Sequence, residues 1–281
     1  MRPGTVLVTG AAGQLAGDLL RRLPGATGRS RQQLDITDFD AVNDAIREIR
    51  AELVFNCAAY NGVDQAEADV EAAFAVNADG AANVARAAAA AGARLVHFST
   101  NYVFDGRREG AYDENDVPSP ESAYGRSKRA GEVAVLAALP DALVVRSAGL
   151  FGRGGSAIKG GSFPDRVLAR ARSGAQLRIV DDQRLNPTYT GHLAAAAITV
   201  AENRLTGILH LVATGCCSYY ELAVEVLRQA RVEADVEPTA TAQLNAPAAR
   251  PTNGCLTSIR RPALPHWREG VAELLTDLAA T

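Results

Sequence analysis

The first regular structure is encoded by Val6-Leu-Val-Thr9-Gly10-Ala-Ala-Gly13-Gln14-Leu15-Ala16. Its apolar run predicts a buried strand, and the residues from Gln14 onward predict a helix. Glycines between a strand and a helix let a dinucleotide pyrophosphate approach backbone N–H groups at the positive end of the helix. We therefore predict that Gly10 and Gly13 belong to a phosphate-binding loop. A plain strand-to-helix turn is the alternative, because a glycine pattern of this kind is weak evidence on its own.

Short apolar runs alternate with helical stretches through the first two-thirds of the chain. This alternation predicts an α/β fold with a parallel, doubly wound sheet of the Rossmann type. The predicted strands are Val6–Val8, Leu53–Asn56, Leu95–Phe98 and Ala142–Arg146, and the predicted helices are Gln14–Leu23, Ala41–Arg50, Glu71–Ala91 and Ser122–Leu139.

The pattern loosens after residue 151 into loops around shorter elements, which indicates a smaller C-terminal substrate-binding lobe built from discontinuous segments. We expect residues 1–150 with about 189–212 to form the nucleotide-binding domain, and residues 151–188 with 213–281 to form the lobe. The elements predicted in this half are helices near Phe163–Arg172, His192–Glu202, Tyr219–Gln229 and Trp267–Leu278, and strands at Leu177–Val180 and Ile208–Val212.

The composition is ordinary for a globular enzyme, with 281 residues, 22% charged residues and a net charge of −3. Such a charge gives no electrostatic case for binding nucleic acid or a membrane surface. Met1-Arg-Pro-Gly4 leads directly into the apolar run Thr5-Val-Leu-Val-Thr9, which is too brief for a signal peptide, and no apolar segment reaches transmembrane length. We expect a cytoplasmic protein that binds a small molecule.

The four cysteines show neither C-x-x-C spacing nor paired histidine motifs. This favours reduced thiols over disulfides or a metal site, since disulfides are rare in the cytoplasm. The residues concerned are Cys57, Cys216, Cys217 and Cys255.

Tyr124 and Lys128 lie four residues apart in a predicted helix, so both project from the same face. An ammonium group near a phenol favours the ionised phenol and lowers its pKa from about 10, which makes the tyrosine a useful proton donor. The alternative is a packed tyrosine beside a solvated lysine, which many helices contain.

The residues about 20 positions beyond the glycine loop, where a Rossmann-type fold ends its second strand, decide the type of dinucleotide. An acidic residue there would bind the adenosine 2′-hydroxyl of NAD, whereas this chain has Gly28-Arg29-Ser30-Arg31. Two guanidinium groups suit a 2′-phosphate, so we predict NADPH as the cofactor with NADH as a weaker substitute. Arg29 and Arg31 are alternatively ordinary surface residues.

Several segments, taken in order over nearly the whole chain, resemble the dTDP-4-dehydrorhamnose reductases, a family of the extended short-chain dehydrogenase/reductase superfamily. The matching segments are Thr9-Gly-Ala-Ala-Gly-Gln-Leu15, Leu34-Asp-Ile-Thr-Asp38, Asn56-Cys-Ala-Ala-Tyr60, Ser99-Thr-Asn-Tyr-Val-Phe-Asp-Gly106, Tyr124-Gly-Arg-Ser-Lys128, Val180-Asp-Asp-Gln183, Pro187-Thr-Tyr-Thr-Gly191 and Arg250-Pro251.

The resemblance implies roles for individual residues. Thr100, Tyr124 and Lys128 match the catalytic triad, in which NADPH delivers hydride to a 4-keto-6-deoxy sugar, the tyrosine protonates the alkoxide and the lysine holds the nicotinamide ribose. The positions that match cofactor contacts are Gly10, Gly13, Gln14 and Leu15 for the pyrophosphate, Asp35 and Ile36 for the adenine side, and Ala58, Ala59 and Tyr60 in the loop after the third strand. Asp35 is alternatively a cap for the helix that begins near Asp38.

The chain departs from the family where the substrate is expected to lie. The family's Ser-Thr-Asp-Tyr is Ser99-Thr-Asn-Tyr102 here, its tryptophan after Arg-Thr-Ser is replaced by Gly149, and its Gly-Ser before Pro-Thr is Leu185-Asn186. Loss of the indole is expected to make room, so we predict a ketoreductase for a different nucleotide sugar. The substrate-facing positions so implied are Thr100, Asn101, Tyr102, Val103, Gly149, Arg184 and Asn186.

Two other functions stay open at this point. Some proteins of this fold are non-catalytic regulatory subunits that bind a dinucleotide, although an intact Thr100, Tyr124 and Lys128 argues against that role. A sugar-nucleotide epimerase or dehydratase also uses Tyr-x-x-x-Lys, but Asn101 removes the first of the two acidic residues that a dehydratase usually carries. A homodimer is open, and no metal ligands are apparent.

Overall fold

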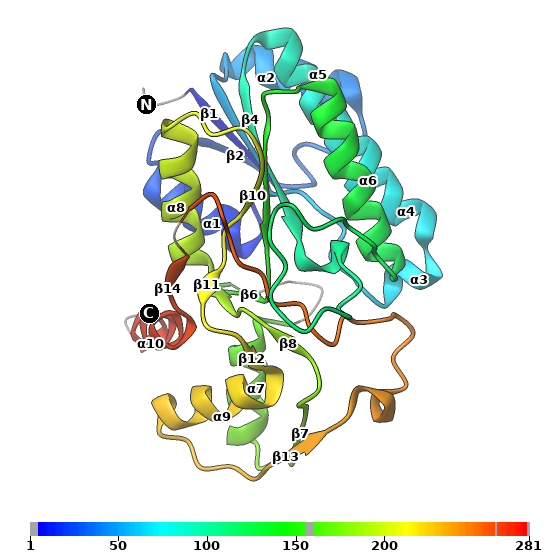
Figure 1. Ribbon diagram of the computed structural model, residues 1–281. Helices are drawn as coiled ribbons and strands as arrows, with labels where there is room; N and C mark the ends of the chain where they lie inside the picture. The colour runs from blue at the N-terminus through cyan, green and yellow to red at the C-terminus, as the bar shows by residue number, and fades with distance from the viewer. Residues whose placement is uncertain (1–4, 155–159, 262, 280–281) are drawn as a thin grey trace.

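The computed structural model describes residues 5–154, 160–261 and 263–279 (Figure 1). Its central sheet has six strands in the order β10-β5-β4-β3-β1-β2, and every neighbouring pair is parallel. The predicted doubly wound α/β architecture is confirmed. The strands are β1 (Val6–Thr9), β2 (Thr27–Arg29), β3 (Leu53–Asn56), β4 (Arg94–Thr100), β5 (Leu143–Ser147) and β10 (Gly207–His210).

Helices cover both faces of this sheet, because successive strand residues point to opposite sides and both sides are apolar. Val6 and Val8 pack into the core beneath α1 (Gln14–Arg22) and α8 (Thr190–Glu202). Leu7, between them, packs into the core on the other face. That second face is covered by α2 (Phe39–Ile49), α5 (Ala81–Ala91) and α6 (Ala123–Ala138).

The long helix predicted for residues 71–91 is interrupted. It consists of α4 (Val70–Phe74), a π-helical turn η1 (Ala75–Gly80) and α5, preceded by the short helix α3 (Gln65–Ala68). π-helical turns are rare and frequently occur at functional sites. An alanine-rich sequence gives no sign of such a turn, so the interruption was not predictable from periodicity.

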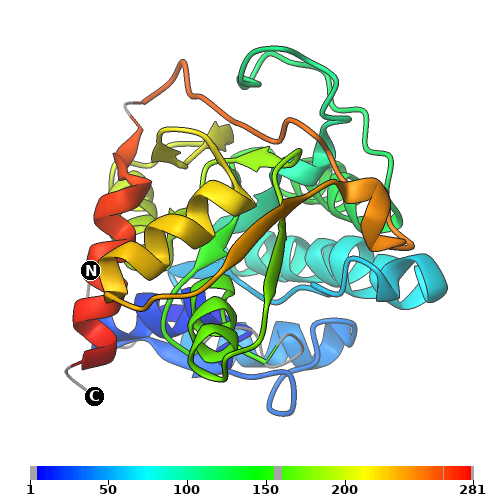
Figure 2. The same cartoon turned by 90° about the horizontal axis from the view of Figure 1, so that it is seen from below.

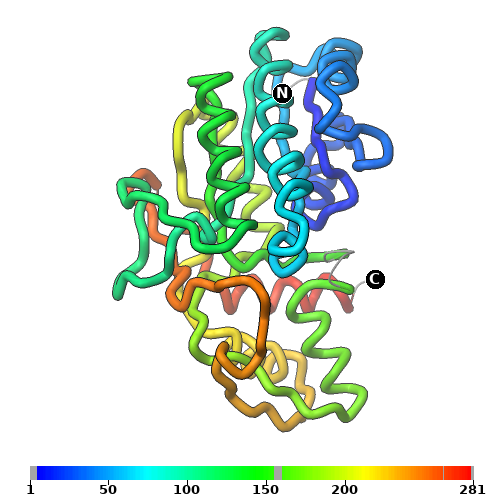
Figure 3. The backbone as a smooth tube through the Cα atoms, turned by 90° about the vertical axis from the view of Figure 1, so that its right-hand side faces the viewer, coloured from blue at the N-terminus to red at the C-terminus, as the bar shows by residue number. Residues whose placement is uncertain are grey.

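The smaller lobe lies beyond the carboxyl ends of the sheet strands (Figures 1 and 3). Seen from below, α9 (Tyr219–Ala230) and β13 (Val236–Thr239) lie in front of the sheet (Figure 2). Its helices are α7 (Phe163–Arg172), α9 (Tyr219–Ala230) and α10 (Trp267–Ala279), close to the predicted bounds, and η4 (Thr241–Leu244) is a 3-10 turn. Its strands are β6 (Leu150–Phe151), β7 (Leu177–Val180), β8 (Arg184–Leu185), β9 (Thr188–Tyr189), β11 (Ala213–Thr214), β12 (Cys217–Ser218), β13 (Val236–Thr239) and β14 (Leu264–His266).

Most of these lobe strands are too short to leave a periodic signal, and the sequence predicted only β7. The domain boundaries given above stay a prediction. Of the N-terminal lead, residues 1–4 lie outside the described residues. No helix in the described ranges has the length and apolar character needed to cross a membrane.

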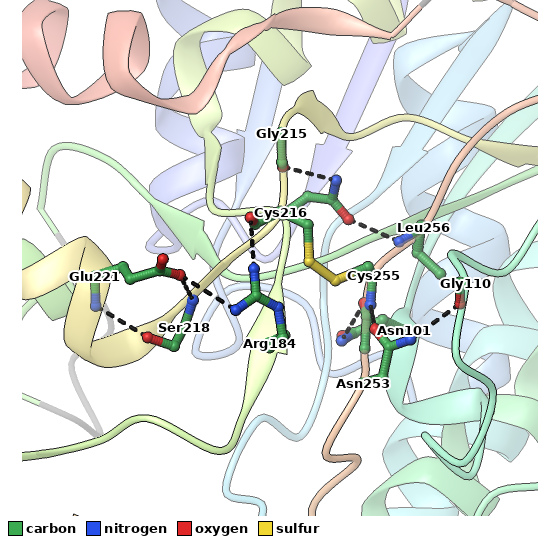
Figure 4. Close-up of a disulfide and its surroundings, with 12 residues drawn as sticks. Asn101, Gly110, Arg184, Gly215, Cys216, Ser218, Glu221, Asn253, Cys255 and Leu256 are labelled. Carbon is green, nitrogen blue, oxygen red and sulfur yellow. Dashed lines mark hydrogen bonds and ion pairs between the residues drawn. A yellow bond between two sulfur atoms is a disulfide. The ribbon is translucent and has the colours of Figure 1, made fainter. Parts of the chain in front are cut away.

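Two of the four cysteines form a disulfide, so the prediction of four reduced thiols is wrong. Cys216 and Cys255 are bonded, with their Cα atoms 6.0 Å apart (Figure 4). Cys57 and Cys217 are free thiols. They meet because β8 pairs with β12 on one side and with the segment around Asn253 on the other. A separation of 39 residues carries no sign of this pairing.

Candidate active site

A cavity of about 260 Å³ lies between the carboxyl ends of the sheet strands and helices α7 and α9 of the lobe. Parallel α/β sheets place their ligands at this edge. Of the residues predicted from the sequence, those that line the cavity are Gly13, Gln14, Leu15, Ala59, Thr100, Asn101, Tyr102, Tyr124, Lys128 and Gly149.

The glycine loop is shaped by a close approach of backbone. Gly10 has a φ of +65°, and a Cβ atom there would lie 2.7 Å from the backbone nitrogen of Ala58, so no side chain fits. Gly13 is the N-cap residue of α1 and supplies no side-chain cap, which leaves the N-terminal end of the helix to face a ligand. The side-chain oxygen Oε1 of Gln14 is buried without a hydrogen-bond partner among the described residues.

The loop after β3 is held by a residue that sequence reasoning missed. Asn77, in the π-helical turn, accepts a hydrogen bond from the Tyr60 backbone nitrogen (2.9 Å) and donates to the Tyr60 carbonyl oxygen (3.1 Å). It also donates to the Ser127 hydroxyl of α6 (2.9 Å). A buried asparagine within an alanine-rich helix was the available signal, because buried polar side chains are nearly always bonded.

The predicted triad converges at the cavity. Ser122 caps α6 by accepting a hydrogen bond from the Gly125 nitrogen (3.0 Å), which places Tyr124 in the first turn and Lys128 one turn later. Lys128 is 2% exposed, and its Nζ donates to the carbonyl oxygen of Phe98 in β4 (2.7 Å). Thr100 ends β4 at the same point of the sheet.

The expected lowering of the tyrosine pKa is not found. Burial raises the pKa of Tyr124 to about 12, while a hydrogen bond with the Thr100 hydroxyl acts in the opposite direction. The ammonium group of Lys128 does not offset the burial, because it is directed to the Phe98 carbonyl instead. Burial lowers the pKa of Lys128 to about 8, and the Glu132 carboxylate partly counteracts this.

The replacements at positions 101 and 149 have direct structural reasons. The Asn101 side-chain nitrogen donates to the carbonyl oxygen of Gly254 (3.0 Å), a bond that an aspartate has no hydrogen to make (Figure 4). Gly149 has a φ of +53°, and a Cβ atom there would lie 2.4 Å from Leu185. The room expected from loss of the indole is therefore partly filled by Leu185.

Three predicted substrate-binding residues do not line this cavity, namely Val103, Arg184 and Asn186. Asn186 is buried and satisfied by backbone groups, since it donates to Ala213 (3.1 Å) and Gly215 (3.0 Å) and accepts from Leu256 (2.7 Å). Val103 is fully buried in a core cluster.

Arg184 is half-exposed outside this cavity. It pairs with Glu221 at 3.4 Å and donates to the Cys216 carbonyl oxygen (Figure 4). It also borders a cavity of about 20 Å³ beside Asn101 and Gly149, and a larger one of about 560 Å³ beside Cys216 and Cys255.

The predicted adenosine-side residues lie at the end of β2, outside the cavity. Arg29 is the last residue of β2, followed by Ser30 and Arg31. Asp35 accepts hydrogen bonds from the backbone and hydroxyl of Thr37, while Asp38 caps α2. The Ile36 side chain is 3% exposed and belongs to the core, so a ligand could reach only its backbone.

Ser147 is a second residue that sequence reasoning missed. It ends β5, lines the cavity and has a buried hydroxyl without a hydrogen-bond partner among the described residues. A polar residue at the end of a buried strand was the available signal. Together with Gln14, it gives the cavity two buried polar groups that a ligand can satisfy.

The fold and the site define a short-chain dehydrogenase/reductase of the extended type. The family model described as the RmlD substrate binding domain matches residues 4–280. The chain belongs to the dTDP-4-dehydrorhamnose reductase family.

Individual relatives are similar over nearly their whole length. The chain is 39% identical, over 98% of its length and 93% of the relative, to a dTDP-4-dehydrorhamnose reductase of Mycobacterium tuberculosis. It is 40% identical, over 98% of its length and 95% of the relative, to a probable dTDP-4,6-dihydroxy-2-methyloxan-3-one 4-ketoreductase of Streptomyces antibioticus. The crystal structure of a dTDP-4-dehydrorhamnose reductase of Bacillus anthracis in complex with NADP superposes with a TM-score of 0.93, at 34% identity over 97% of this chain and 98% of that one.

Proposed function

We propose that this protein is an NADPH-dependent reductase of a nucleotide-activated 4-keto-deoxysugar, with Tyr124 as the proton donor. The observation that carries this proposal is the convergence of Thr100, Tyr124 and Lys128 on the cavity that the glycine loop borders. The names of its relatives, which include dTDP-sugar ketoreductases and a complex with NADP, support the same activity.

The residues present fit a dinucleotide. Gly10 and Gly13 leave the backbone open for a pyrophosphate at the N-terminal end of α1. Gln14 and Ser147 offer buried polar atoms that lack protein partners within the described chain. When bound, NADPH supplies the hydride.

The protein's own part in the reaction is proton transfer and charge stabilisation. With its pKa raised by burial, Tyr124 stays protonated at neutral pH and can donate to the oxygen of a reduced ketone. The Thr100 hydroxyl bonds to the phenol and orients it. Lys128 places a positive charge in the same buried site, where it stabilises the negative charge that develops on that oxygen.

The experiment is NADPH oxidation followed with a panel of dTDP-4-keto-sugars. General acid catalysis contributes about 10²–10⁴-fold, so Tyr124→Phe should lower kcat by about 10²-fold or more while still binding NADPH. Tyr220→Phe, in α9 and outside the cavity, is the matched control and should keep full activity. A wild-type protein that binds NADPH but reduces no sugar would instead favour the regulatory-subunit function.

The preference for NADPH rests on Arg29 and Arg31 at the end of β2. Guanidinium groups pair with a phosphate, so Arg29→Ala with Arg31→Ala should raise the KM for NADPH about tenfold or more and leave that for NADH unchanged. A wild-type protein that uses NADH clearly better than NADPH would contradict this assignment.

We further propose that the sugar differs from dTDP-4-dehydrorhamnose. Asn101, Gly149 and Leu185 together reshape the wall beside the triad, and one relative is named for a different ketone. The prediction is a low kcat/KM for dTDP-4-dehydrorhamnose. A value of about 10⁴ M⁻¹s⁻¹ or more, typical of good enzymes, would contradict it.

A further inference from the structure

A buried charged cluster lies directly behind the triad, and the mechanism above does not use it. Its centre is Glu132, whose side chain is fully buried in α6. Arg146 of β5 donates to both carboxylate oxygens, from Nε to Oε1 and from Nη2 to Oε2, each at 2.8 Å. Arg129, which is 35% exposed, donates to Oε2 at 2.9 Å.

The same carboxylate is bonded to the strand that carries Thr100. The Ser99 hydroxyl donates to Oε1 of Glu132 at 2.6 Å, and Ser99 is the residue before Thr100. In the sheet register, Ser99 lies opposite Arg146 and Thr100 lies opposite Ser147. Glu132 therefore joins α6, β4 and β5 at the edge where the triad is assembled.

Glu132 also follows Lys128 by one helical turn. Residues four apart on a helix share a face, so Tyr124, Lys128 and Glu132 form one row along α6. Lys128 needs a counter-charge because it is buried, and burial of an ammonium group favours its neutral form.

The other groups that face Lys128 do not supply that charge. Burial raises the pKa of the Cys57 thiol, in the loop after β3, and lowers the pKa of His97 in β4 well below its ordinary range. Tyr124 is protonated at neutral pH, since its pKa is about 12. Among the described residues that act on Lys128, Glu132 is the one ionised near neutrality, because its arginine partners lower the pKa of its carboxyl group.

We propose that Glu132, held by Arg146, is a positioning residue of the reductase: it fixes Ser99 and hence Thr100, and it is the buried counter-ion that keeps Lys128 protonated. The role in catalysis rests on the proposed function. The electrostatic role concerns the free protein and can be measured without substrate or cofactor.

The chain contains only two lysines, Lys128 and Lys159, so lysine labelled with ¹³C at Cε gives two NMR signals. Lys159→Arg assigns them. In the wild type, the Lys128 signal should titrate with a pKa of about 8. In Glu132→Gln, which keeps the shape of the side chain, that pKa should fall by about one unit or more.

Two variants serve as comparisons. Arg129 contacts the same carboxylate from the helix surface. Arg129→Gln removes that contact and should leave the Lys128 pKa no lower than in the wild type. Ser99→Ala removes only the hydrogen bond that joins β4 to the Glu132 carboxylate, so it should lower kcat several-fold while leaving the lysine titration unchanged.

Glu132→Gln leaves the Arg146 charge buried without its partner, which can prevent folding. Glu132→Gln combined with Arg146→Met removes both charges and should show the same fall in the Lys128 pKa. If either folded variant titrates as the wild type does, the proposal is wrong.

The pH profile of kcat separates the outcomes. The loss of activity at alkaline pH should move to lower pH in Glu132→Gln together with the lysine titration. If the wild type reduces no ketosugar but the NMR shift is observed, the proposed function fails and the counter-ion role stands. If the wild type is active and the NMR shift is absent, the counter-ion role fails alone.

Discussion

Two residues explain the loss of an indole at position 149. Gly149 adopts a left-handed conformation, and Leu185 occupies the space that any side chain at position 149 would need. The two positions are therefore coupled, although they are 36 residues apart in the sequence. A side chain at position 149 would therefore fit only if Leu185 were replaced by a smaller residue as well.

This coupling gives a stability prediction. Gly149→Ala should lower the free energy of unfolding by about 1–3 kcal/mol, because it combines a positive φ with a contact at 2.4 Å to Leu185. Gly174→Ala is the matched control, since Gly174 has a φ of +71° and nothing within 4 Å of a Cβ atom. Urea unfolding should show the smaller loss at Gly174.

The Leu185→Ala background completes the test. With the leucine shortened, Gly149→Ala should cost no more than Gly174→Ala does. Equal costs in both backgrounds would show that the two positions are not coupled.

Residues that act through local spacing could be predicted from the sequence. Tyr124 and Lys128 share a helix face, and Gly10 lies in a single loop, so a short segment contains the whole signal. Asn186 could not be assigned in this way. Its partners Ala213 and Leu256 come from distant segments, and only the folded chain shows that they satisfy its amide.

At the level of elements, the π-helical turn η1 connects the cofactor side of the site to α6. Asn77→Ala removes hydrogen bonds to both backbone groups of Tyr60 and to the Ser127 hydroxyl. We expect the free energy of unfolding to fall by about 2–4 kcal/mol and the KM for NADPH to rise.

Ser127→Ala removes one of these three bonds, together with the bond that the Ser127 hydroxyl donates to the Tyr124 carbonyl oxygen, and should cost about 1–2 kcal/mol in the same urea titration. An Asn77→Ala protein with the wild-type unfolding midpoint would contradict this role for the turn.

The disulfide fixes a second junction, between the start of β12 and the segment beside β8. Cross-linking residues 39 apart in sequence stabilises a protein by about 4 kcal/mol in the chain-entropy account. Dithiothreitol should therefore lower the unfolding midpoint of the wild type, and Cys216→Ser should reproduce that midpoint without reductant.

Cys217→Ser is the matched control, because Cys217 is the neighbouring buried cysteine and has a free thiol. Its response to dithiothreitol should equal that of the wild type. A wild-type midpoint that does not respond to reductant would show that the disulfide does not stabilise the fold.

The elements themselves were predictable to different degrees. Most strands and helices of the sheet domain lie close to their predicted bounds, because each is an apolar or amphipathic run. The exceptions are β2, for which no bounds were predicted, and the helix predicted for residues 71–91, which η1 interrupts. The lobe strands β8 and β12 have two residues each and exist only through their pairing with distant segments. The disulfide depends on that pairing, which is why the cysteine spacing did not predict it.

The buried imidazole of His97 should make the stability of the entire fold depend on pH. His97 is fully buried in β4, and desolvation lowers its pKa well below the ordinary value. The unfolded chain gains a proton below about pH 6.5 that the folded protein does not bind. The free energy of unfolding should therefore fall as the pH falls, by about 1.4 kcal/mol per pH unit below pH 6.5 for this group.

Chemical denaturation between pH 7 and pH 5 measures this slope. His97→Gln should reduce it, whereas His266→Gln, at the half-buried last residue of β14, should retain it. A slope that is the same in all three proteins would exclude His97 as its source.

The position of β10 has a consequence for how the chain is made. It closes the sheet beside β5, but it follows β5 only after β6, α7, β7, β8, β9 and α8. A ribosome adds about 5–20 residues per second, so β5 waits several seconds for its neighbour. During translation its open edge is a place where a nascent chain can pair with the wrong strand or recruit a chaperone. Truncation before residue 207 should therefore yield an aggregating fragment rather than an independent nucleotide-binding domain.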